Sequence, residues 1–233
     1  MKKILFIISF VLIPLLYAKS IGFEYQGVSV QAVGLDGKKQ EMIVKRHIPD
    51  ECKSLPINNE MLWTGNYAHK SVPETCKSTY VHTKGKLLPM TLDDELETYG
   101  ELEVLASLKD MQKHSTTVLI DARKEPWFKY RTIPGAVNMP FYYFKEREDY
   151  EFQFEYALRY LGVKIVEDKP YDFTSAKILV IFCNGPWCSQ SPTMIYALRE
   201  VGYPAEKLKW YRGGMQDWLS AGMTTTRGYL EHK

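Results

Sequence analysis

The 233-residue sequence lacks the features that mark most specialised classes of protein. Its formal net charge is only +2 and no basic stripe stands out, so we expect no nucleic acid partner. The 15 glycines and 12 prolines are too sparse and too scattered for a disordered chain. The four cysteines form no CxxC or CxxCH motif and the five histidines are scattered, so we expect neither a metal nor another cofactor. With 45% hydrophobic and 25% charged residues, the composition is that of an ordinary globular protein.

Residues 1–20 have the pattern of a secretory signal peptide. The positive pair Lys2 and Lys3 precedes an apolar stretch over 4–17, and small residues follow, so we expect cleavage after Ser20 or, alternatively, after Ala18. A retained membrane anchor is the competing interpretation, but the apolar stretch is short for a span and no later run is long enough. The short basic start is typical of bacterial signals. We therefore expect a soluble periplasmic protein without stable membrane insertion.

Residues 21–97 read as a β-rich extension. The segments 28–33 and 41–46 flank an Asp-Gly turn, which predicts a β-hairpin. An oxidising compartment permits disulfides, and Cys52 and Cys76 both lie in the irregular polar stretch that follows. A structural Cys52–Cys76 bridge is the simplest pairing, although four cysteines allow three connectivities. The prediction is a disulfide-stapled extension with no functional motif of its own.

From residue 98 onward, strand-like and helix-like apolar patterns alternate. The strand-like runs cover 117–121, 178–182 and 208–211, and the helix-like runs cover 102–108, 150–161, 190–201 and 215–219. This alternation predicts an α/β fold, a parallel sheet with helices on both faces. The predicted organisation is a signal peptide (1–20), the extension (21–97), an α/β domain (98–226) and a short tail (227–233).

Cys183 is the strongest candidate for a catalytic residue. It ends the buried run 178–182 and is followed by a tight polar loop and then a helix. Loop N–H groups and a helix N-terminus stabilise an anion, so we expect a lowered thiol pKa and a nucleophilic cysteine. An inert core cysteine is the alternative. Asp121 and Arg123 follow the neighbouring run 117–121, and the carboxyl ends of parallel strands meet at one edge, which favours the functional interpretation.

Four segments, in this order, resemble the rhodanese-like sulfurtransferase domain family. They are 119–123, 133–140, the strand and loop at Cys183, and 210–218. The resemblance covers about residues 98–226 and implies the rhodanese-like parallel sheet flanked by helices. It also implies that Cys183 takes a sulfane sulfur from thiosulfate, a polysulfide or a protein persulfide. The sulfur is held as a persulfide and passed to a thiophilic acceptor such as a thiol.

The resemblance also assigns roles around Cys183. The outer sulfur would be cradled by backbone N–H groups of the loop, namely those of Asn184, Gly185, Trp187, Cys188 and Ser189. Asp121 and Arg123 match the Asp-x-Arg of the family, so Arg123 would brace the loop and its charge would help to hold an anionic donor. A purely structural ion pair is the alternative role for these two residues.

The loop departs from the usual family pattern in three ways. No Lys or Arg lies between Cys183 and Ser189, where family loops often carry basic residues, so a polysulfide or protein persulfide is favoured over thiosulfate. Pro186 has no N–H to donate, and Trp187 adds an aromatic edge. Cys188 is a second thiol, which we expect to pack inertly under the loop rather than to resolve an oxidised Cys183.

Two other functions stay open. Cys183 and Cys188 could form the redox pair of a thiol–disulfide protein. The fold could also serve as a non-catalytic binding module, with 21–97 contacting a partner, although retention of Cys183 argues against this. Phosphatases of this fold need a longer loop ending in Arg, which is missing here.

Overall fold

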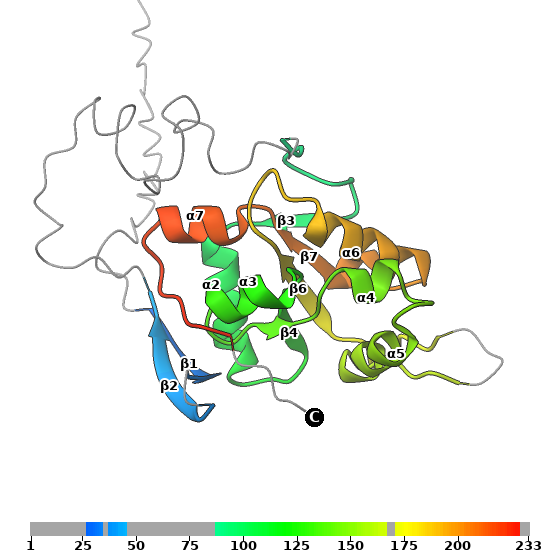
Figure 1. The fold of residues 1–233 in the computed structure, drawn as a ribbon, viewed down its shortest axis with the longest axis horizontal. Coiled ribbons are helices and arrows are strands. Elements are labelled where there is room, and N and C mark those ends of the chain that lie inside the picture. The colour runs from blue at the N-terminus through cyan, green and yellow to red at the C-terminus, as the bar shows by residue number, and fades with distance from the viewer. Residues whose placement is uncertain (1–26, 35–36, 46–86, 167–170, 229–233) are drawn as a thin grey trace, which may run out of the picture.

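The computed structural model describes residues 27–34, 37–45, 87–166 and 171–228 (Figure 1). The predicted signal peptide and the proposed Cys52–Cys76 bridge lie outside these residues. The strands are β1 (Val28–Val33), β2 (Lys39–Val44), β3 (Glu97–Tyr99), β4 (Thr117–Asp121), β5 (Val137–Asn138), β6 (Ile178–Phe182) and β7 (Leu208–Tyr211). The helices are α2 (Glu101–Met111), α3 (Glu125–Tyr130), α4 (Tyr142–Lys145), α5 (Glu151–Tyr160), α6 (Gln190–Glu200) and α7 (Gly214–Ser220), with a 3₁₀ turn at Ala205–Lys207. None of the helices in the described ranges is long and apolar enough to cross a membrane.

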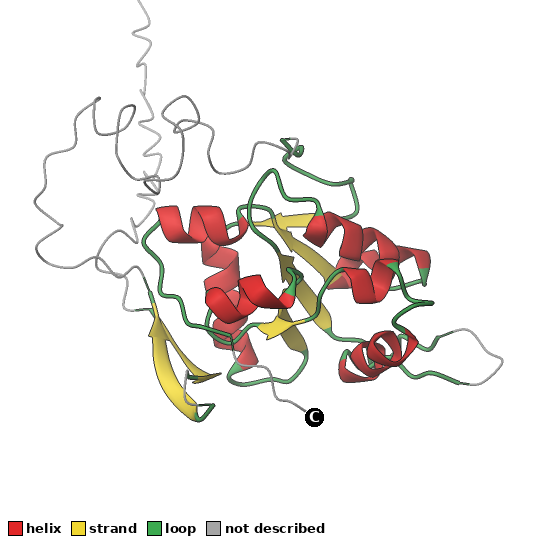
Figure 2. Cartoon of the chain, viewed as in Figure 1, coloured by secondary structure: helices red, strands yellow, loops and turns green. Residues whose placement is uncertain are grey.

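The predicted α/β fold is confirmed. Five strands form a parallel sheet in the order β3-β7-β6-β4-β5 (Figure 2). The central strands β4 and β6 are short β-branched and aliphatic runs of the kind that a sheet buried on both faces requires. Asp121 at the end of β4 is aligned with Phe182 at the end of β6, and Phe182 with Tyr211 at the end of β7. The carboxyl ends of these three strands therefore form one edge.

Alternating side chains of the sheet feed two hydrophobic cores. Val118 and Ile120 of β4 point into the core formed with α4, α5 and α6, whereas Leu119 points into the core formed with α2, α7 and the β1–β2 hairpin. The helix periods that the sequence shows match these faces. For example, Phe154, Ala157 and Leu158 of α5 are buried.

The β1–β2 hairpin packs against the α/β domain. The two strands are antiparallel, as predicted, and Val28, Val30 and Val44 enter the core beside α2. The backbone of Lys45 exchanges hydrogen bonds with Thr224, which lies beyond α7. Figure 1 shows the hairpin in blue beside α2. The described part of the extension therefore contributes apolar surface to the core of the α/β domain.

Four short elements escape the sequence patterns. They are β3, α3, β5 and α4, with two to six residues each. Elements of this length show too few repeats for a period of 2 or 3.6 residues to be read. β3 begins at Glu97, the last residue of the predicted extension, and pairs with β7, so the sheet of the α/β domain starts one residue before the predicted boundary.

Candidate active site

Cys183 lies immediately after β6, at the carboxyl edge of the sheet. Its side chain is 2% exposed, so the sulfur is almost fully enclosed by the protein. The loop 184–189 turns the chain from β6 into α6, which begins at Gln190. Ser189 is the residue before the helix, and its side chain makes no capping hydrogen bond. The structure thus places Cys183 where a parallel sheet usually presents its functional groups.

Ser191 contacts the sulfur of Cys183 and was not identified from the sequence. Its buried hydroxyl donates a hydrogen bond to Cys183 Sγ at 3.0 Å and accepts one from the indole N–H of Trp210 at 3.1 Å. Trp210 is the buried third residue of β7, so the neighbouring strand sets the orientation of the hydroxyl. A serine in the first turn of the helix after a candidate nucleophile is a local signal that could have indicated this contact.

The N-terminus of α7 holds the loop from the other side. Met215 N–H donates to the carbonyl of Cys183 at 3.0 Å, and Gln216 N–H donates to the carbonyl of Asn184 at 2.9 Å. This approach requires Gly214, which has φ +56°, because a Cβ there would overlap with the Cys183 carbonyl oxygen. Trp187 is half-buried and its indole N–H donates to the Gln216 side chain. Two separate segments of the resemblance, the cysteine loop and the Gly-Gly turn, therefore form one backbone unit.

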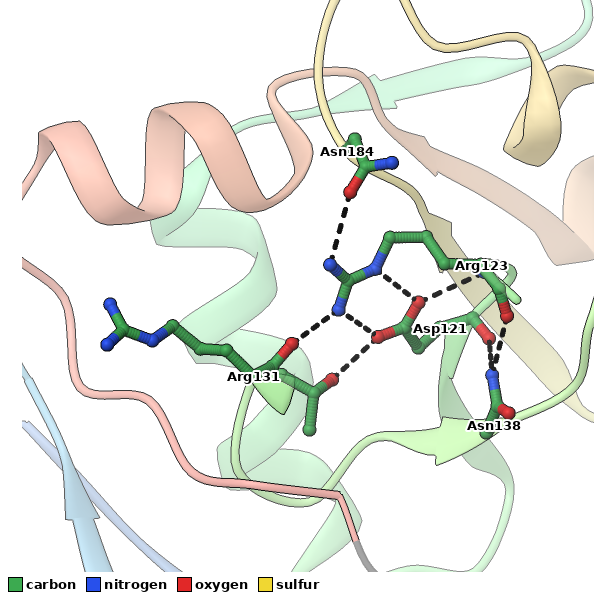
Figure 3. A network of polar contacts seen from close by, with 6 residues as sticks. Asp121, Arg123, Arg131, Asn138 and Asn184 are labelled. Carbon is green, nitrogen blue, oxygen red and sulfur yellow. Dashed lines mark hydrogen bonds and ion pairs between the residues drawn. The ribbon is translucent and has the colours of Figure 1, made fainter. Parts of the chain in front are cut away.

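Asp121 and Arg123 form a buried ion pair beside this loop (Figure 3). The Arg123 guanidinium is 3% exposed and donates to both carboxylate oxygens of Asp121, to the carbonyl of Arg131 and, at 3.1 Å, to Oδ1 of Asn184. Arg123 therefore contacts the loop at the side chain of Asn184 and not at the sulfur of Cys183. Its burial and its protein partners leave the predicted role in anion binding without a contact that supports it.

Asn138 is a second residue that sequence reasoning missed. From the end of β5, its amide nitrogen donates to the carbonyls of Asp121 and Arg123, both at 2.9 Å (Figure 3). The Thr132 hydroxyl adds a hydrogen bond to the Asp121 carboxylate at 2.8 Å. Both residues belong to or border the 133–140 segment. In the structure, residues in or next to this segment therefore hold the Asp121–Arg123 pair in place.

A short segment of the extension, Leu88 and Pro89, also reaches the loop, and we call it the strap. Leu88 N–H donates to the carbonyl of Pro186 at 2.8 Å, and Arg212 donates to the carbonyls of Leu88 and Pro89. Pro186 lacks an N–H, as the sequence shows, but its carbonyl is used here. Arg212 lies in the 210–218 segment, directly after β7. The extension therefore has a contact with the candidate site that its sequence did not reveal.

Cys188 lies in the same loop as Cys183 and is buried there. Cys188 is 5% exposed and, like Cys183, is a free thiol. Cys183 Sγ also lies 3.2 Å from the carbonyl oxygen of Cys188. The Cys188 N–H closes a turn onto the carbonyl of Gly185 at 2.9 Å, so this donor is used inside the loop rather than for a sulfur cradle. A turn spanning a few residues thus brings both thiols to one place.

The two thiols have opposite pKa shifts. Burial raises the pKa of Cys183 well above its ordinary value, and the hydrogen bond to Cys188 raises it further, with Ser191 opposing. The hydrogen bond from Cys183 lowers the pKa of Cys188 to about 7, aided by the N–H groups of Asn184 and Gln190 and the charge of Arg123. The predicted lowering for Cys183 is therefore wrong, because the enclosed site removes the water that would stabilise its thiolate.

No metal site accompanies these thiols in the part of the chain that the structure describes. The His, Cys, Asp and Glu side chains there form no group of three or more that could hold an ion. Ser191 donates a hydrogen bond to the Cys183 sulfur, and this contact lowers the pKa of Cys183. The site is chemically suited to nucleophilic sulfur chemistry.

Replacement of Ser191 by alanine should raise the pKa of Cys183 further, because the Ser191 hydroxyl bond lowers it. Thiolate forms at higher pH, so the pH profile of any reaction at Cys183 should move to higher pH. We expect about a tenfold lower rate at neutral pH from the loss of one hydrogen bond to an anion. Rates of alkylation by iodoacetamide between pH 6 and 10, measured on both proteins in a Cys188→Ser background, test this. An unchanged pH profile of alkylation would show that the Ser191 hydroxyl does not stabilise the Cys183 thiolate.

Comparison with known proteins places these features in a family context. The model of the rhodanese-like domain matches residues 104–221, just over half of the chain. This range contains Asp121, Arg123, the Cys183 loop and Gly214, whereas the hairpin and the strap lie outside it.

Individual relatives are distant. The HTH-type transcriptional regulator Rv0324 of Mycobacterium tuberculosis is 22% identical over 123 residues, which cover 53% of this chain and 43% of that protein. The chain thus spans less than half of that relative. Among solved structures, a rhodanese with anions from E. coli is 22% identical, with 48% of this chain and 99% of that chain covered and a TM-score of 0.31. A thiosulfate sulfurtransferase from Pseudomonas aeruginosa is 20% identical, with 57% and 21% covered and a TM-score of 0.36.

Proposed function

Because this chain belongs to the rhodanese-like domain family, we propose that it is a sulfurtransferase that carries a sulfane sulfur on Cys183. The observation that supports this most directly is the environment of the Cys183 sulfur. The sulfur lies at the carboxyl edge of the sheet and accepts a hydrogen bond from the Ser191 hydroxyl. The loop that follows Cys183 is held by α7 and Arg123. An inert core cysteine needs none of these polar contacts.

The first step is the loading of Cys183. The thiol must lose its proton, because the thiolate is the nucleophile. Cys188 lies in the same loop, and its lowered pKa of about 7 suits it as the base that accepts this proton. The Cys183 thiolate then attacks the sulfane sulfur of the donor. The sulfur–sulfur bond of the donor breaks, and its electron pair leaves with the remainder: sulfite from thiosulfate, or a shorter chain from a polysulfide. Cys183 holds the transferred atom as a persulfide, which a thiol acceptor can take.

Polysulfide or a protein persulfide is the donor that the site favours. No Lys or Arg lies between Cys183 and Ser189, and the nearby Arg123 is buried in its pair with Asp121. A dianion such as thiosulfate would lose its hydration at this loop and gain little charge compensation in return. A polysulfide or persulfide carries less charge for each sulfur atom and avoids most of this cost.

The cellular setting is part of the proposal. The pattern of residues 1–20 supports export and cleavage, so the enzyme would act in the periplasm on a small sulfur anion or a protein persulfide. A net charge of +2 supports neither nucleic acid nor a membrane surface as a partner. The HTH name of the mycobacterial relative belongs to a protein of which this chain covers 43%, and we do not extend DNA binding to this chain.

Intact-mass measurement tests the function. Protein isolated from the periplasmic fraction should have the mass of a chain starting at residue 19 or 21. After incubation with polysulfide or thiosulfate and acid quenching, it should gain the mass of one sulfur atom, located on the Cys183 peptide. The Cys183→Ser variant should gain nothing there and should transfer no sulfur to cyanide. An equal gain in this variant would refute the proposal.

A further inference from the structure

Two buried thiols stand at the two ends of the six-residue segment 183–188, and the proposed sulfur carrier uses only one of them as a nucleophile. Cys183 and Cys188 are 2% and 5% exposed, and Cys183 Sγ lies 3.2 Å from the carbonyl oxygen of Cys188. The turn is closed by the Cys188 N–H on Gly185 and is held from outside by Leu88, on the carbonyl of Pro186. The turn that positions Cys183 therefore also fixes Cys188 against it.

The surroundings of Cys188 stabilise a thiolate. The side chain of Cys183, the backbone N–H groups of Asn184 and Gln190 and the positive charge of Arg123 all lower the pKa of Cys188. The resemblance assigns one of these groups, the N–H of Asn184, to the outer sulfur of a persulfide. Here they serve the second cysteine, whose pKa of about 7 leaves a large thiolate fraction at neutral pH.

We propose that Cys188 resolves the Cys183 persulfide and releases the carried sulfur as hydrosulfide. This inference rests on the proposed function, because it needs a persulfide on Cys183. The Cys188 thiolate attacks Sγ of Cys183, and a Cys183–Cys188 disulfide forms. The bond between Sγ and the outer sulfur breaks, and its electron pair leaves with the outer sulfur as HS⁻. The outer sulfur is reduced, the two cysteines are oxidised, and a dithiol reductant returns them to thiols by disulfide exchange.

Attack on the inner sulfur is favoured over transfer of the outer sulfur to Cys188. Transfer would expel the Cys183 thiolate, whose buried site raises its pKa and makes it a poor leaving group. Hydrogen sulfide is a stronger acid than an ordinary thiol, so hydrosulfide leaves more readily. Cys188 also has an advantage over an external thiol as the attacking group. The enclosed Sγ of Cys183 is hard for an external thiol to reach, whereas Cys188 lies in the same turn.

The experiment compares wild type with Cys188→Ser and Cys188→Ala. Each full-length mature protein is reduced, loaded with inorganic polysulfide, desalted and left without added thiol. Sulfide is trapped with monobromobimane, and acid-quenched samples are analysed by intact mass and non-reducing peptide mapping. Wild type should release sulfide at least about tenfold faster than the variants while its Cys183 and Cys188 peptides become linked. Both variants should keep the added sulfur on Cys183 until a dithiol is supplied.

The possible results separate this inference from the proposed function. If wild type keeps its persulfide as long as Cys188→Ser does, with no linked peptide, the resolving role is refuted while the sulfurtransferase survives. If the added sulfur appears on Cys188, transfer has replaced resolution and the inference also fails. If neither wild type nor the Cys188 variants acquire sulfur on Cys183, the proposed function fails first. Thermal unfolding and circular dichroism of each variant establish that the loop change leaves the fold intact.

Discussion

Arg123→Ala should destabilise the protein by about 3–5 kcal/mol, the cost of leaving a buried carboxylate without its partner. Asp121 is 0% exposed and would keep only the Thr132 hydroxyl and the Arg123 backbone N–H as donors to its carboxylate. The carbonyl of Arg131 and Oδ1 of Asn184 would lose a donor as well. Urea unfolding followed by tryptophan fluorescence measures the loss directly.

The double variant Asp121→Leu/Arg123→Met is the matched control. It removes both charges and keeps apolar volume, so its loss should be clearly smaller than that of Arg123→Ala. Because Asn184 loses its contact in both proteins, sulfur loading should slow in both. A loss below about 1 kcal/mol for Arg123→Ala would mean that the pair behaves like a surface salt bridge, in conflict with its burial.

Gly214→Ala should reduce sulfur loading by about a hundredfold or more, because the loop that carries Cys183 must shift to admit a methyl group. A Cβ at this position would overlap with the carbonyl oxygen of Cys183 and lie 2.9 Å from the Gly185 nitrogen. These atoms belong to the backbone and cannot move aside as a flexible side chain can. The hydrogen bonds from Met215 and Gln216 to the loop would weaken at the same time. Single-turnover loading with polysulfide, followed by mass spectrometry, measures the effect.

Gly202→Ala separates backbone strain from displacement of the loop. Gly202 also has a positive φ, +93°, but the nearest atom to a Cβ there belongs to the Phe173 side chain at 3.3 Å. Both variants should lose about 1 kcal/mol or more of stability from the strained conformation. The Gly202→Ala protein should load sulfur at the rate of wild type. Similar loading defects in both variants would show that the close approach of α7 to the loop is not what positions Cys183.

The parallel sheet was predictable because its signals are local. The runs that form β4, β6 and β7 are short, apolar and separated by helix-period segments, and each signal lies within about ten residues of chain. The position of Cys183 at the end of β6 follows from the same signal, since a strand ends where the apolar run ends. The short elements β3, β5 and α4 carry no such signal, because they are held by neighbours in the fold rather than by their own periodicity.

The supports of the site required the tertiary structure. Asn138 holds the carbonyls of Asp121 and Arg123 across 15 or more residues of chain, and Trp210 orients Ser191 from another strand. The strap at Leu88 reaches Pro186 across almost a hundred residues. No local pattern encodes such contacts, because each depends on how strands and loops are placed in the folded sheet.

By itself the sequence determined the class of fold, the family resemblance and the cysteine that the site is built around. It could not determine the direction of the pKa shift of Cys183 or of Cys188. Local reasoning counted the N–H groups of the loop and expected a lowered pKa at Cys183, but α7, Arg123 and the strap enclose the loop and exclude water. Only the folded structure decided that the N–H groups of Asn184 and Gln190 lower the pKa of Cys188, because desolvation and side-chain direction depend on what packs around the turn.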